Sequence, residues 1–197
     1  MTIELEGLAP DFGPPLERFR SFDAQVHRPP AAHPETPLVE RAFEGSAQFA
    51  EALHALLAHA EACGARRLAW CDPDFSGWPL GESAWVERLT SWVRGGQREL
   101  VMIASHWDAV PRLHPRFVGW RRDFAHAVQC LVPDEFHTPP LPTLWVDSAD
   151  QALRVFDAEH SRGRAGVDRI DRQRANEEFD AIAQRATPGF AAGTLGL

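Results

Sequence analysis

Hydrophobic residues early in the chain recur every three or four positions. Over residues 46–63 this spacing places apolar side chains on one face of a predicted helix. The residues on that face are Phe49, Leu53, Leu56, Leu57 and Ala60. Ser46 is the expected N-cap, and Gly64 follows as the expected C-terminal glycine.

The middle of the chain alternates short apolar runs with helical patterns. The runs RRLAWCD, ELVMIAS and AVQCLVP are predicted strands. Two predicted helices separate them. The first has Trp85, Leu89, Trp92 and Val93 on one face and ends at Gly95-Gly96, and the second spans residues 114–126. Nearly continuous apolar strands joined through helices are typical of a parallel sheet that is covered on both faces.

After residue 140 the pattern changes to strands joined by turns. TLWVD, QALRVF and RAGVDRI are three such strands, and a helix is expected over residues 175–186. Strands joined by short turns pair antiparallel. The predicted fold class is therefore α/β, a layered domain with a mixed sheet flanked by helices and a late antiparallel meander.

Three regions are predicted along the chain. Residues 1–37 are rich in proline, which excludes long helices and central strands, and are expected to form an extended arm. Residues 38–190 form the α/β domain, and residues 191–197 a flexible tail. No apolar run is long enough for a membrane span, and the first residues lack the pattern of a signal peptide. We therefore expect a cytoplasmic protein with no membrane partner.

Composition excludes several kinds of chemistry. All 20 basic residues are arginine, so Schiff-base catalysis and a P-loop lysine are excluded. The three cysteines form no CxxC pair and are expected to be reduced. A net charge of −8 argues against nucleic acid as a partner. One local exception to that charge is a group of arginines close to tryptophans, which could stack on bases: Arg112, Arg116, Arg121 and Arg122, beside Trp107 and Trp120.

Four stretches carry a resemblance to a known family. They are FEGSAQFAEALHALLAHA, DPDFSGWPLGE, HPRFVGWRRDFAHAVQC and WVDSADQALRVFDAEHSRGRAGVD. Over residues 43–190 the chain resembles a bacterial group of uncharacterised phospholipase D-like domains, some of which are joined to acetyltransferase domains. The resemblance implies one half of the phospholipase D-like fold. It also implies a site built on HxKx4D, in which a histidine attacks phosphorus and a lysine holds phosphate oxygens.

That motif is absent at the matching position. When Asp147 is aligned with the motif aspartate, Pro140 and Pro142 stand at the histidine and lysine positions. Proline offers neither a nucleophile nor a charge, so phospholipase D-type catalysis cannot occur here. Asp147 is then expected to cap the backbone of a turn.

Two other groups of residues carry alternative hypotheses. Asp72, Asp74, His106 and Asp108 follow two predicted parallel strands. Ligands gather at such strand ends, so these side chains could bind a metal and make the protein a metal-dependent hydrolase or phosphodiesterase. Alternatively, they cap turns and helices.

The second group is His160, Arg162 and Arg164. Guanidinium groups bind phosphate and carboxylate, so this segment could bind an anion or a nucleotide. Alternatively, SRGR is a solvated turn.

The function expected from the sequence is that of an inactive phospholipase D-like domain, a pseudoenzyme that serves as a binding or interaction platform without a cofactor. Active single-copy relatives pair around the motif, so the resemblance implies a homodimer. The link to acetyltransferase domains implies a separate protein partner.

Overall fold

The computed structural model describes residues 41–134, 139–166 and 168–190. The predicted arm (residues 1–37) and tail (residues 191–197) lie outside these described residues. The α/β domain predicted from residue 38 is described from Arg41 onward.

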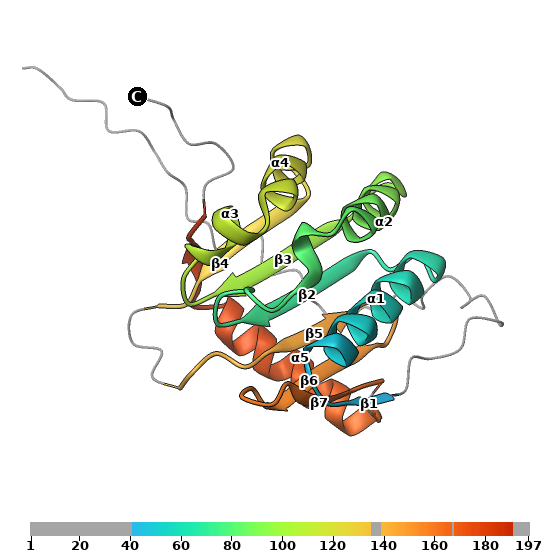
Figure 1. Ribbon diagram of the computed structural model, residues 1–197, viewed down its shortest axis with the longest axis vertical. Coiled ribbons are helices and arrows are strands. Elements are labelled where there is room, and N and C mark those ends of the chain that lie inside the picture. Colours follow the sequence, from blue (N-terminus) through green and yellow to red (C-terminus); the bar gives the residue numbers. More distant parts are fainter. Residues whose placement is uncertain (1–40, 135–138, 167, 191–197) are drawn as a thin grey trace, which may run out of the picture. The chain divides into compact units, whose positions relative to one another are not determined.

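Eight strands form one mixed sheet (Figure 1). They are β1 (Arg41–Phe43), β2 (Arg67–Asp72), β3 (Glu99–Ala104), β4 (Val128–Val132), β5 (Leu144–Asp147), β6 (Ala152–Asp157), β7 (Arg162–Ala165) and β8 (Thr187–Pro188). Their order across the sheet is β1-β7-β6-β5-β2-β3-β4-β8. β2, β3 and β4 are parallel, whereas β5, β6, β7 and β1 pair antiparallel in series beyond β2. The mixed sheet with a late meander is as predicted.

The helices cover the two faces of the sheet unequally. They are α1 (Ser46–Ala62), η2 (Pro79–Gly81), α2 (Ser83–Arg94), α3 (Ala109–Leu113), α4 (Pro115–Asp123) and α5 (Arg169–Ala183). Helices α1 to α4 lie on one face, and α5 lies on the opposite face (Figure 1). Helix α5 packs against β5, β2 and β6.

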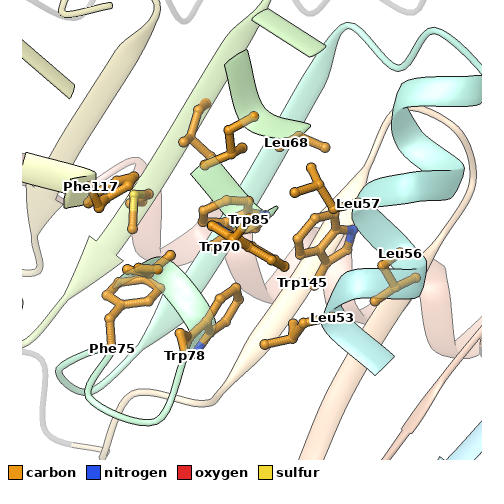
Figure 2. Close-up of a cluster of buried hydrophobic side chains, with 14 of the residues drawn as sticks. Leu53, Leu56, Leu57, Leu68, Trp70, Phe75, Trp78, Trp85, Phe117 and Trp145 are labelled. Carbon is orange, nitrogen blue, oxygen red and sulfur yellow. The ribbon is translucent and has the colours of Figure 1, made fainter. Parts of the chain in front are cut away.

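Tryptophans fill the core beneath α1 and α2 (Figure 2). Trp70 of β2 stacks on Trp145 of β5 with ring centroids 5.0 Å apart. Trp78 and Trp85 pack against Trp70 at 5.3 and 5.8 Å. Aromatic pairs at these separations stabilise a core beyond the area they bury. This cluster joins β2 to β5, the point where the parallel half of the sheet meets the antiparallel half.

A smaller core lies on the other face. Phe179 and Ile182 of α5 are buried against residues of the central strands, including Ala69 and Val146. In the described residues, no helix is both long and apolar enough to cross a membrane.

Several predicted boundaries were wrong, including the ends of the helices predicted over residues 114–126 and 175–186. Helix α5 begins at Arg169 rather than at residue 175, because the Asp168 side chain accepts hydrogen bonds from the amides of Ile170 and Asp171 and so starts the helix earlier. RAGVDRI is therefore a strand only as far as Ala165. The N-cap of α1 is Gly45, with a φ of 86°, and Ser46 is already helical.

Candidate functional site

Asp147 ends β5 and is buried, with 9% of its surface exposed. Its Oδ2 accepts a hydrogen bond from the Trp145 indole at 2.9 Å. Its Oδ1 accepts from the amides of Ala149 and Gln151 at 2.8 and 3.1 Å. Asp147 therefore caps the β5–β6 turn, as predicted.

Burial dominates the electrostatics of Asp147. Loss of water raises its pKa to about 6, although the three hydrogen bonds act to lower it. Pro140 and Pro142 lie before β5, and Pro140 is exposed. Neither Pro140 nor Pro142 brings a reactive group near this aspartate.

Asp72 is the second buried carboxylate, and its two oxygens hold together three segments of the fold. Oδ1 accepts from the amides of Asp74 and Phe75 at 3.0 and 2.7 Å. Oδ2 accepts from the Trp78 indole at 3.1 Å and from the Thr143 hydroxyl at 2.7 Å. Burial raises the pKa of Asp72, against the effect of these bonds. These contacts support the alternative that Asp72 closes a turn.

The other residues of the predicted metal site do not join Asp72 in a metal-binding arrangement. Asp74 Oδ1 accepts from the amide of Ser76 at 2.8 Å. Asp108 precedes α3, and His106 and Asp108 are both exposed. Throughout the described ranges, no three His, Cys, Asp or Glu side chains are grouped closely enough to hold a metal ion. The prediction that these four residues converge is therefore not supported by the geometry.

The His160 segment covers an exposed turn and the start of β7. His160 and Arg162 each have an acidic partner. His160 Nδ1 lies 2.9 Å from Asp157 Oδ2. Arg162 donates to Glu44 Oε1 at 2.7 Å, and this bond raises the pKa of the guanidinium. Arg164 is exposed on β7. Only Ser161 of SRGR lies in the turn, so the expectation of a turn was wrong for residues 162–164, which belong to β7. The acidic partners of His160 and Arg162 give no support to an anion site.

The arginines near α4 do not form a stacking surface for bases with the two tryptophans. Trp107 and Trp120 are buried at 6% and 5% exposure. Arg121 is also buried, where it donates to the backbone oxygen of Phe190 and lies over the Phe190 ring. Arg116 donates to the backbone oxygen of Gly81 at 3.0 Å. Part of this arginine group therefore serves packing within the fold.

A groove that the sequence did not predict lies between α5 and β6. We call it the α5–β6 groove. It has a volume of about 390 Å³ and is lined by Ala152, Arg154, Phe156, Asp171, Arg174, Ala175 and Glu178. The formal charges of two arginines and two carboxylates cancel in this lining, which also contains two alanines. A volume of this size with a partly apolar lining is typical of binding sites.

The charged side chains of the groove form two ion pairs of different strength. Arg154 contacts both carboxylate oxygens of Glu178, the longer contact being Nη2 to Oε1 at 3.3 Å. Arg174 is 3.9 Å from Asp171, and its side chain is 73% exposed. The Arg154–Glu178 pair therefore joins the sheet to α5, whereas Arg174 and Asp171 are held only loosely.

Two large apolar side chains are exposed beside the groove. Phe156 of β6 is 62% exposed, and Ile170 in the first turn of α5 is 61% exposed. The alternation of QALRVF could have indicated the first, since it places Phe156 on the same side of the strand as Arg154. Ile170 could not have been placed, because RAGVDRI read as a strand.

No family model matches the chain, and no curated protein matches it. Among solved structures, that of TrmBL2, an archaeal chromatin protein, is similar to this chain. The TrmBL2 structure is described as showing a novel mode of DNA binding. The TM-score is 0.54 at 10% sequence identity, and the match covers 76% of this chain and 55% of TrmBL2. This chain thus spans little more than half the length of that protein, and the likeness shows a shared fold alone.

Proposed function

We propose that this chain is a non-catalytic, phospholipase D-like interaction domain that binds a protein partner through the α5–β6 groove. The observation that carries the proposal is the pair of exposed apolar side chains, Phe156 and Ile170, beside a concave surface. Large apolar side chains grouped around a concavity are typical of interaction surfaces.

The non-catalytic part of the proposal draws support from the roles of the two buried aspartates. Asp147 directs one oxygen to its own turn and the other to the Trp145 indole. Asp72 directs both oxygens to Trp78, Thr143 and nearby amides. A general base or a metal ligand needs an oxygen that faces the substrate or the metal. These carboxylates are instead used to hold β2 and β5 in place.

A protein partner suits the groove better than nucleic acid does. Phosphate backbones bind surfaces with an excess of Lys and Arg, and the lining of this groove pairs two arginines with two carboxylates. The chain also carries a net charge of −8. The DNA binding named for TrmBL2 belongs to that protein, because the likeness at 10% identity concerns the fold.

Site-specific photo-crosslinking in the native host tests the surface. A photoreactive phenylalanine analogue at position 156 is compared with the same analogue at Leu113, which is 53% exposed on α3, on the other face of the sheet. We expect a discrete protein adduct from position 156 and none from position 113. An absence of adducts at 156, or equal adducts at both positions, would contradict the proposal.

The lack of catalysis is tested separately with a generic phosphodiester substrate, with and without divalent metals. No turnover above the uncatalysed rate is expected. Turnover that is lost in a His106→Ala variant would contradict this part of the proposal and restore the hydrolase alternative. His106 is exposed, so the substitution leaves the core intact.

A further inference from the structure

A β-bulge lies at Phe156, a residue that lines the groove. The pairing of β6 with β7 passes from Val155↔Gly163 directly to Asp157↔Arg162, so Phe156 is an extra residue without a partner in the ladder. Bulges of this kind redirect a side chain and strengthen the local twist. Phe156 lines the groove, and 62% of its surface is exposed.

Helix α5 supplies the opposite wall. Its residues in the lining, Asp171, Arg174, Ala175 and Glu178, recur at helical spacing and so share one face. Ile170 lies one turn before Arg174 on the same side of the helix. The apolar side chains Phe156 and Ile170 therefore come from the two elements that form the groove.

The charged side chains of this surface can pair with the same side chains on a second copy of the chain. Asp171 and Arg174 carry opposite charges three residues apart on α5, and their own contact is long, at 3.9 Å. A twofold contact places residue i against j and j against i. Two such helices crossing antiparallel can therefore pair each Asp171 with the Arg174 of the other copy.

The groove lining is better suited to a contact between two copies than an acidic surface of this chain would be. With a net charge of −8, two copies repel each other at long range. The groove lining, with two arginines and two carboxylates, adds no net charge to that repulsion. A strongly acidic or basic partner would leave half of these side chains opposite a like charge.

We propose that the partner bound at the α5–β6 groove is a second copy of this chain, held by a twofold contact. Phe156 of each copy occupies the groove of the other, over the small side chains Ala152 and Ala175, and Asp171 pairs with Arg174 in both directions. This proposal rests on the proposed function, since it names the partner of the same surface.

Light scattering after size exclusion, together with sedimentation equilibrium, measures the oligomeric state of the whole chain. We expect a dimer for the wild type and a monomer for Phe156→Ser. A control substitution, Leu113→Ser, removes a comparably exposed apolar side chain, 53% against 62%, from α3 and should leave the dimer unchanged. Loss of a central aromatic contact weakens an interface by about tenfold or more.

Charge reversal tests the pairing without removing apolar area. Asp171→Arg and Arg174→Asp each place like charges across the twofold axis, so each variant alone should be monomeric. An equimolar mixture of these two variants should form a heterodimer, and the double variant should dimerise as the wild type does. Circular dichroism of each variant verifies that α5 remains folded.

Three outcomes overturn the inference. They are a monomeric wild type, a dimer that Phe156→Ser weakens no more than Leu113→Ser does, and a mixture of the reversed variants that stays monomeric. A monomer whose position 156 still cross-links to another protein refutes the second copy but retains the interaction surface. A monomer without any adduct at position 156 refutes both proposals.

Discussion

Asp147 makes the stability of this protein depend on pH in an unusual direction. Its burial raises its pKa to about 6 in the folded chain. An aspartate in an unfolded chain titrates near a pKa of about 3.9. The folded state therefore holds a proton on Asp147 more tightly than the unfolded state does. The stability from this group is complete below about pH 3.9 and is lost as pH rises through about 6.

The size of the effect follows from the difference between the two pKa values. A difference of about two units corresponds to about 3 kcal/mol in the free energy of unfolding, of which about 2 kcal/mol is lost between about pH 4.5 and pH 8. Asp74, Asp157 and Asp168 have lowered pKa values and act in the opposite direction. The contribution of Asp147 must therefore be measured as a difference between two proteins.

The two proteins to compare are the wild type and the Asp147→Asn variant. The asparagine oxygen can still accept from the amides of Ala149 and Gln151, while its NH₂ group faces the Trp145 indole N–H. Urea unfolding of both proteins across this pH range should show the wild type losing about 2 kcal/mol relative to the variant. The indole N–H resonance of Trp145 should titrate with a midpoint near the pKa of about 6. A difference that is constant with pH, or that grows as pH rises, would refute the reasoning.

The remaining predictions concern packing and the buried polar contacts. Gly163→Ala should lower the free energy of unfolding by about 1–3 kcal/mol, because the new methyl group would collide with the Phe43 ring and neighbouring backbone. Gly119→Ala should raise the free energy of unfolding by about 0.5–1 kcal/mol, because Gly119 lies in α4 with open space around it. Thermal or urea unfolding of the pair measures both signs, and equal effects would contradict the packing argument. Asp72→Ala leaves four donors without their acceptor and should lower the free energy of unfolding by at least about 3 kcal/mol. Asp108→Ala, at an exposed position, should change the free energy of unfolding by no more than about 0.5 kcal/mol. Equal losses in the two aspartate variants, measured in the same assay, would contradict the structural role of Asp72.

Periodicity predicted the elements with the strongest patterns. The spacing of Phe49, Leu53 and Leu57 indicated α1, and all three side chains are buried. The apolar run ELVMIAS indicated β3, which is buried between β2 and β4. In both cases the local pattern and the tertiary environment agree, so the pattern alone is sufficient.

The start of α5 shows where local patterns mislead. In RAGVDRI the β-branched residues indicated a strand, whereas Asp168 acts as an N-cap and starts a helix at Arg169. A capping signal and a strand signal competed there, and the two hydrogen bonds to the Asp168 side chain decided the outcome. Because the α5 wall of the groove depends on this helix start, the sequence could not indicate the groove.

The two buried aspartates serve the packing of the tryptophan core. Asp147 and Asp72 bind donors on either side of the tryptophan cluster, at Trp145 and at Trp78. These two rings stack with their centroids 6.4 Å apart, and both pack on Trp70. Each carboxylate therefore orients an indole that joins β2 to β5, where the parallel and antiparallel halves of the sheet meet. The burial and the hydrogen bonds of both aspartates are therefore accounted for by the packing of the core.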